Sequence, residues 1–150
     1  MKVASEQLMN LAGASLKLPI FPLNTDGVDL YAQNVTIRRA KITNFDDAIV
    51  VKPSRHDADR VYSTCSANIL AEDIDVTYGV GMSVGTVSPD PNNNCVKNVT
   101  FRNIKFDKPL KAIYIKTNPG DEGSGIVQNI TYENIVMKTP IWWAIYIGPQ

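Results

Sequence analysis

The sequence has 150 residues, of which 44% are hydrophobic, and its 15 basic and 15 acidic side chains cancel to zero formal net charge. This composition fits one globular domain, and the balanced charge gives no sign of a nucleic-acid partner or an anionic membrane surface. No apolar run approaches the roughly 18 residues of a membrane-spanning helix, and the start, MKVASEQLMN, lacks the basic and apolar segments of a signal peptide.

The first predicted strands share one short pattern. Each begins with a small residue, continues with an apolar residue, and has a second apolar residue two positions later, as expected for a strand with one buried face. In chain order these strands cover residues 27–30, 48–51, 81–84, 112–115 and 144–147. The shared register predicts an inward ladder of Ile49, Met82, Ile113 and Ile145, beside an outward column of Ser83, Tyr114 and Tyr146.

A second set of strands alternates with the first, and each of its members begins at an asparagine. Counting from that asparagine, positions +1, +3, +6 and +8 are apolar, and a polar pair at +4 and +5 shifts the alternation. These segments cover residues 34–42, 68–76, 98–106 and 129–137. The shift predicts that each segment is two short strands that meet at a corner.

The repeat returns every 31 to 33 residues or so after a first step of 21, which indicates an all-β solenoid of about four to five parallel turns. A β-sandwich of hairpins is the alternative, but two-residue Asn-Gly turns are absent between these strands. We expect one domain over residues 1–150. Neither end shows a capping element, so we also expect the C-terminal part of a longer solenoid, or packing against neighbouring chains.

The two cysteines occupy one column on adjacent turns, because Cys65 and Cys95 each lie three residues before an asparagine of the repeat. Adjacent turns bring their Cα atoms to about 5 Å, which predicts a disulfide and an oxidising, extracellular location; two stacked free thiols are the alternative. Asn34, Asn98 and Asn129 begin N-x-T sequons and are candidate glycosylation sites. Equally, asparagine at a repeated corner can serve a left-handed backbone.

Carboxylates gather at the start of two neighbouring strands. Asp26 falls in the same column as Asp47, and Asp46 precedes Asp47, so the three side chains should cluster outside the solenoid. Close carboxylates oppose each other's ionisation, which lets one keep a proton for acid catalysis while another activates water. The alternative is that these aspartates are solvated residues of turns with no catalytic role. An elongated face of acids, hydroxyls, rings and lysines suits a linear sugar polymer.

With these residues in order, the sequence resembles glycoside hydrolase family 28, the polygalacturonases and their relatives. The motifs are NTDGVDL, FDDAIVVKP, YGVGMSVGT and YIKT, and the resemblance covers residues 21–150. It implies a right-handed parallel β-helix that hydrolyses pectin-like glycans with inversion, without a metal or other cofactor. Asp46 would be the general acid, and Asp26 and Asp47 would hold the attacking water. Inversion predicts carboxyl groups roughly 6.5–9.5 Å apart.

The resemblance also implies that Asn24, Tyr114 and Lys116 bind the polysaccharide, with two departures from the family pattern. Val80 stands where the family has a histidine between two glycines, and Tyr114 stands where it has an arginine that grips a substrate carboxylate. Tyrosine cannot pair with a carboxylate bidentately, so the substrate should be less acidic or bound differently. His56 in a surface loop could reach the groove, but we favour an unrelated surface position.

Two further alternatives remain open from the sequence. A non-catalytic extracellular solenoid for carbohydrate binding or assembly is favoured by the two departures and the open ends, whereas the three aspartates favour a hydrolase. A pectate lyase is disfavoured, because the acids are too few for a calcium cluster. Of Trp142 and Trp143, we expect packing in the core or an interface rather than stacking on sugar.

Overall fold

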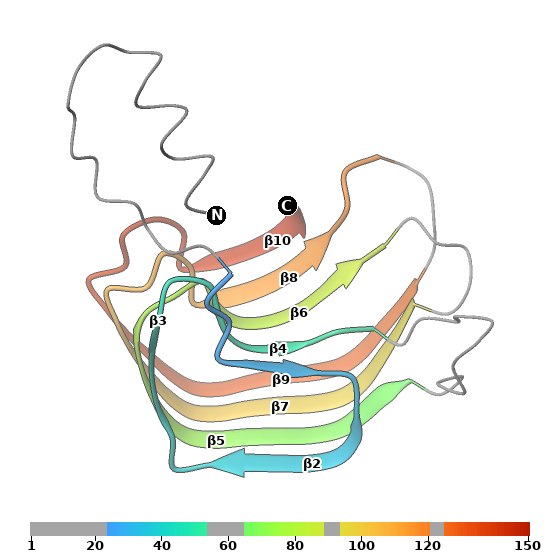
Figure 1. Ribbon diagram of the computed structural model, residues 1–150, viewed down its shortest axis with the longest axis horizontal. Coiled ribbons are helices and arrows are strands. Elements are labelled where there is room, and N and C mark those ends of the chain that lie inside the picture. The colour runs from blue at the N-terminus through green and yellow to red at the C-terminus, as the bar shows by residue number, and fades with distance from the viewer. Residues whose placement is uncertain (1–23, 54–64, 89–93, 121–124) are drawn as a thin grey trace.

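The computed structural model describes residues 24–53, 65–88, 94–120 and 125–150 of the chain, and these residues form two parallel sheets without a helix. The sheets face one another and are joined at corners, as Figure 1 shows. This is the predicted parallel β-solenoid. No described helix is present that could cross a membrane.

The first sheet, whose outer face carries the site described below, has five strands. Its order is β1 (Val28–Leu30), β4 (Asp47–Val51), β6 (Gly81–Val87), β8 (Ile113–Thr117) and β10 (Ile145–Pro149). Ile49 pairs with Met82, Met82 with Ile113, and Ile113 with Ile145, which confirms the predicted ladder. Ile49 and Met82 are fully buried, whereas Ile145 is 58% exposed because β10 pairs on one side only within the described residues.

The second sheet contains the strands that begin near the repeated asparagines. It consists of β2 (Gln33–Arg38), β5 (Ser66–Tyr78), β7 (Asn94–Asp107) and β9 (Gly125–Lys138), and the short β3 (Lys41–Asn44) pairs with the far end of β5. Two expectations need correction. The described residues form about three turns rather than four to five. The expected two-strand segments are single bent strands in β5, β7 and β9, because pairing with the neighbouring turns continues on both sides of the corner.

Each corner is made by a residue with a left-handed backbone. The repeated asparagines Asn34, Asn68, Asn98 and Asn129 have φ between 54° and 58°, and Arg39, Asp73, Asn103 and Asn134 have φ between 52° and 58°. Asparagine accepts this conformation more readily than most residues. Along the first corner, each amide nitrogen donates to the preceding asparagine's amide oxygen at 3.0–3.1 Å. We call this row of four residues the asparagine ladder.

The core fills the space between the two sheets with side chains of both. Ile49, Met82 and Val84 of the first sheet meet Val99 and Phe101 of the second, all fully buried. The predicted disulfide is present: Cys65 and Cys95 are bonded across adjacent turns, with their Cα atoms 4.6 Å apart. Since each turn is too small to bury a core alone, stacking and the disulfide together hold the strands in register.

Candidate active site

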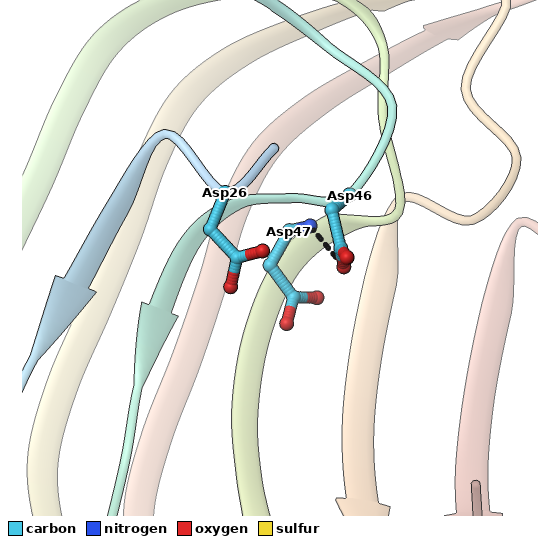
Figure 2. A group of neighbouring side chains, drawn as sticks. All are labelled: Asp26, Asp46 and Asp47. Carbon is cyan, nitrogen blue, oxygen red and sulfur yellow. Dashed lines mark hydrogen bonds between the residues drawn. The ribbon is translucent and has the colours of Figure 1, made fainter. Parts of the chain in front are cut away.

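Asp26, Asp46 and Asp47 lie together at the start of the first sheet, as the register predicted. Asp26 lies in the turn before β1, Asp46 in the turn before β4, and Asp47 is the first residue of β4. One oxygen of each carboxyl lies within 4.8 Å of those of the other two (Figure 2). Gly27 makes the close approach possible, because a Cβ there would lie 2.3 Å from the Ala48 carbonyl oxygen.

One oxygen of each carboxyl lies within 4.8 Å of those of the other two, a closer approach than the roughly 6.5–9.5 Å expected between the two carboxyl groups of an inverting enzyme. Two features of the backbone impose the shorter distance. Asp46 and Asp47 are consecutive, and the Asp47 N–H donates to Asp46 Oδ1 at 2.8 Å. The Gly27 N–H donates to the Asp47 carbonyl oxygen at 2.9 Å, which brings the turn of Asp26 onto the same strand.

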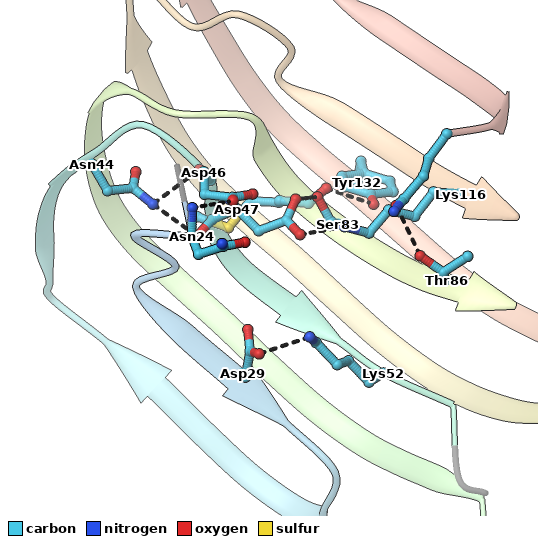
Figure 3. A network of polar contacts seen from close by, with 12 residues as sticks. Asn24, Asp29, Asn44, Asp46, Asp47, Lys52, Ser83, Thr86, Lys116 and Tyr132 are labelled. Atoms are coloured by element: carbon cyan, nitrogen blue, oxygen red, sulfur yellow. Dashed lines mark hydrogen bonds and ion pairs between the residues drawn. The ribbon is translucent and has the colours of Figure 1, made fainter. Parts of the chain in front are cut away.

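Asp47 is the most enclosed of the three carboxylates, with 1% of its surface exposed. Its Oδ1 accepts a hydrogen bond from Ser83 Oγ at 2.5 Å, and its Oδ2 accepts one from Lys116 Nζ (Figure 3). A buried carboxylate with an ammonium and a hydroxyl donor has the partners that its ionised form needs. Lys116, which the sequence assigned to substrate binding, is therefore paired with Asp47.

Asp46 is stabilised by backbone donors on both oxygens. Its Oδ2 accepts from the Asn24 N–H at 3.0 Å, and its Oδ1 accepts from the Asp47 N–H at 2.8 Å. Asn24, assigned from the sequence to substrate binding, thus contacts an aspartate through its backbone. Val80, which the resemblance places in the position of a histidine, donates its N–H to the Asp46 carbonyl oxygen at 2.8 Å.

Asp26 has a raised affinity for its proton. Burial raises the pKa of Asp26 to about 6, and a hydrogen bond with Asp29 and the negative charge of Asp46 act in the same direction. Asp29 is itself paired with Lys52 at 2.7 Å. Asp26 therefore changes its charge near pH 6.

Asn44 joins the two turns that carry the aspartates, and sequence reasoning missed it. This side chain is 6% exposed, and its Nδ2 donates to the carbonyl oxygens of Thr25, Asp46 and Asp47 at 3.0, 2.9 and 2.8 Å. One amide group thus fixes the backbone on either side of the cluster (Figure 3). The available signal was an asparagine two residues before the aspartate pair.

The three carboxylates open into a pocket of about 390 Å³, within the usual range for small-ligand sites. Tyr114 and Lys116 line this pocket as the sequence indicated, and Lys111 lines it without having been anticipated. Tyr114 is 3% exposed, with the Lys111 Nζ 3.8 Å from its ring centroid, so its ring offers little surface to a sugar. His56 lies outside the described residues.

Trp142 and Trp143 stack on one another rather than entering the core. Their ring centroids are 4.2 Å apart, Trp143 also stacks on Tyr146 at 4.9 Å, and the two tryptophans are 53% and 45% exposed. The expected core packing of these rings is therefore wrong within the described residues. Both rings follow β8 and β9 in the chain and precede β10, where a single neighbouring strand leaves them accessible.

The same three carboxylates are also the one described group of acidic side chains spaced closely enough to share a metal ion. One carboxylate of this group, Asp47, already has the ammonium of Lys116 as its counter-charge. The arrangement supplies what acid–base hydrolysis needs: several carboxyl groups close together, so that one can donate a proton while the others hold a water, and an adjoining pocket.

Comparison with known proteins agrees with this chemistry. The chain is 32% identical over 130 residues to a polygalacturonase of Juniperus ashei, covering 86% of this chain and 23% of that protein. It is 31% identical over 128 residues to an exopolygalacturonase of Cochliobolus carbonum, covering 77% of this chain and 26% of that protein. It is 33% identical over 120 residues to a probable endo-xylogalacturonan hydrolase A of Aspergillus fumigatus, covering 78% and 27%.

No solved structure matches the chain, and the chain spans about a quarter of the length of these relatives. The family model described as "Glycosyl hydrolases family 28" matches residues 1–148. Because this match covers nearly the whole sequence and includes the turns that carry Asp26, Asp46 and Asp47, the chain belongs to glycosyl hydrolase family 28.

Proposed function

We propose that this chain carries the catalytic carboxylates of a pectin hydrolase, one that cleaves glycosidic bonds between uronic acid units. The single observation that supports this most is the meeting of Asp26, Asp46 and Asp47 at the edge of one pocket. The printed names of the relatives, polygalacturonase and xylogalacturonan hydrolase, support the substrate class. Since the chain spans about a quarter of those proteins, the acting enzyme is a longer protein in which residues 1–150 form one part of a single β-helix.

In the proposed reaction, Asp46 donates its proton to the leaving glycosidic oxygen as the bond to the anomeric carbon breaks. A water held by Asp26 and Asp47 attacks that carbon and gives its proton to one of these carboxylates. Each Asp46 oxygen accepts one backbone N–H and keeps a second lone pair, and one of these two lone pairs takes the proton. No step requires a metal ion or another cofactor.

The stereochemical outcome is proposed to be inversion, although the short oxygen separation is closer to the roughly 5–5.5 Å of retaining enzymes. Two considerations support inversion. A water hydrogen-bonded at about 2.8 Å to two oxygens fits between oxygens up to about 5.6 Å apart, and those here lie within 4.8 Å. Asp47 is 1% exposed and its two oxygens already accept hydrogen bonds from Ser83 and Lys116, so a small water can use a remaining lone pair, whereas a sugar carbon cannot approach closely enough to form a bond.

The first test is to incubate the intact parent protein with a panel of glycans and to measure released reducing ends. Cleavage of galacturonans is expected, and proton NMR of the first product should show the anomer opposite to the substrate linkage. Absence of cleavage on every glycan would favour the alternative function, a carbohydrate-binding solenoid, which the Val80 and Tyr114 departures support. The same anomer in substrate and product would contradict inversion.

A secreted location is also proposed, supported by the disulfide between Cys65 and Cys95. The three sequons differ in how much a glycan on the amide nitrogen would disrupt the asparagine ladder. Asn98 and Asn129 each use the amide nitrogen as a ladder donor, whereas Asn34 only accepts a hydrogen bond within the described residues. Asn34 is therefore the sequon at which a glycan would cost the ladder least.

A further inference from the structure

Lys111 is a nearly buried cation whose contacts are aromatic rings rather than carboxylates. It is 9% exposed, and its Nζ lies 3.8 Å from the Tyr114 ring centroid, 4.6 Å from that of Tyr146 and 5.4 Å from that of Trp142. Cation–π contacts of this kind hold an ammonium in place but do not neutralise its charge.

The other two lysines of the pocket differ from Lys111 in this respect. Lys116 is paired with Asp47 and Lys52 with Asp29. Across the parts of the chain that the structure describes, Lys111 has no carboxylate within ion-pairing distance. Among the described residues, the pocket therefore holds one cation that no carboxylate pairs with directly.

An anion bound at this position would stabilise the charged form of Lys111. Burial lowers the pKa of Lys111 and the positive charge of Lys116 lowers it further, while the negative charge of Asp47 offsets only part of this effect. Lys111 lines the same pocket as Asp26, Asp46 and Asp47, so a ligand that touches the aspartates can extend to the ammonium. A neutral ligand there would leave the buried charge uncompensated, which is costly.

Lys111 is well suited to bind a ligand carboxylate in this part of the pocket. Tyr114 cannot form an ion pair with a carboxylate, and the Lys111 ammonium lies over the ring of that tyrosine. A lysine binds a carboxylate as a point charge, with less geometric demand than the arginine fork.

We infer that Lys111 is the specificity-determining residue that binds the carboxylate of a substrate sugar, and so selects a free uronic acid unit over its ester or a neutral sugar. This inference rests on the proposed hydrolase function. Tyr114 and Tyr146 are the rings that hold the ammonium at the pocket wall, rather than stacking surfaces for the sugar at this position.

The test compares Lys111→Met, which keeps the length and removes the charge, with Lys111→Arg, which keeps the charge. Lys105→Met, on an exposed position of β7, is the matched control for the change in net charge. KM and kcat are measured in the intact parent protein on a galacturonan oligomer with free carboxylates and on the same oligomer as its methyl ester.

Lys111→Met should raise KM on the free acid by about tenfold or more, as expected for loss of a hydrogen bond to a charged group, and should leave KM on the ester and kcat on both nearly unchanged. Lys111→Arg should restore most of the loss, and Lys105→Met should have no effect. Equal losses on acid and ester, or no loss on either, would overturn the assignment.

Calorimetric measurement of binding to the free-acid oligomer distinguishes a failure of the Lys111 assignment from a failure of the proposed hydrolase function. If the wild-type protein binds the oligomer without cleaving any glycan, and Lys111→Met weakens binding by about tenfold, the hydrolase proposal fails and the Lys111 assignment stands. If the wild-type protein and Lys111→Met bind the oligomer equally, or neither binds it, the assignment of Lys111 is wrong.

Discussion

Asp26, Asp46 and Asp47 have chemically identical side chains, but each carboxyl group has different neighbours. Strand pairing fixes the columns of a solenoid, so the sequence register was enough to predict that Asp26 and Asp47 would meet. Their distinct environments could not be predicted in this way. The ammonium on Asp47 comes from Lys116 on β8, two strands away, and the amide that joins the two turns comes from Asn44 on β3. Such contacts depend on side-chain conformations that periodicity does not specify.

At the residue scale, the pH dependence of turnover reports which aspartate holds the water. Asp26 must be ionised to act as a base, and its pKa is raised to about 6. Turnover by the parent protein should therefore fall as the pH drops through about 6. A rate profile whose loss occurs as the pH rises through about 6 would instead identify Asp26 as the proton donor and contradict the proposed roles.

The same raised pKa affects folding stability. The folded state binds the Asp26 proton more tightly than the unfolded state, whose pKa is near 3.8, so this stabilisation is present below about pH 3.8 and is lost as the pH rises to about 6. Asp26→Asn cannot titrate, so its stability relative to the wild type should increase between pH 4 and pH 7. Urea denaturation at both values measures this; a difference between the two proteins that does not change with pH would contradict it.

Asn44 is expected to position the aspartates as well as stabilise the fold. Asn44→Ala removes three hydrogen bonds to backbone carbonyls, so the free energy of unfolding should fall by about 1–3 kcal/mol and turnover should fall at least about tenfold through displaced carboxylates. Thr43→Ala, on the exposed side of the same strand, is the control and should change neither. Full turnover in folded Asn44→Ala would limit this residue to a structural role.

At the scale of the elements, the repeat predicted which residues face inward and where each strand turns. The left-handed corners explain why asparagine recurs at a position that could also be read as a glycosylation signal. Periodicity did not predict that β5, β7 and β9 run through their corners as continuous strands, because this depends on hydrogen bonding to both neighbouring turns.

The asparagine ladder can be tested by comparing its middle with its end. Asn98 both donates and accepts a ladder hydrogen bond, whereas Asn34 only accepts one. Asn98→Ala should lower the free energy of unfolding by about 2–3 kcal/mol, from lost hydrogen bonds and the cost of alanine at positive φ, and Asn34→Ala should cost less. Asn98→Gly removes the conformational cost of positive φ but still lacks the amide hydrogen bonds, so its free energy of unfolding should lie between those of Asn98→Ala and the wild type. Equal effects of alanine at both positions, measured by chemical denaturation, would argue against a cooperative ladder.

At the scale of the whole molecule, the solenoid places an acidic cluster and three lysines along one face of a parallel sheet. The sequence predicted this elongated face, and with it the family, because stacked columns convert sequence spacing directly into position. It did not predict the burial of Tyr114 beneath Lys111 or the exposed stack of Trp142, Trp143 and Tyr146. Those features depend on which side chains fill the space beside β8 and β10.

The most direct test of the central claim is hydrolysis of galacturonan by the intact parent protein carrying Asp46→Asn, followed through released reducing ends. The substitution keeps the size of the side chain and lies outside the core, so the far-ultraviolet circular dichroism spectrum and the binding of the oligomer should be retained. Turnover should be lost, because the amide cannot donate the proton that the leaving oxygen requires. A folded Asp46→Asn protein that releases reducing ends at the wild-type rate would contradict the assignment of these aspartates as the catalytic group.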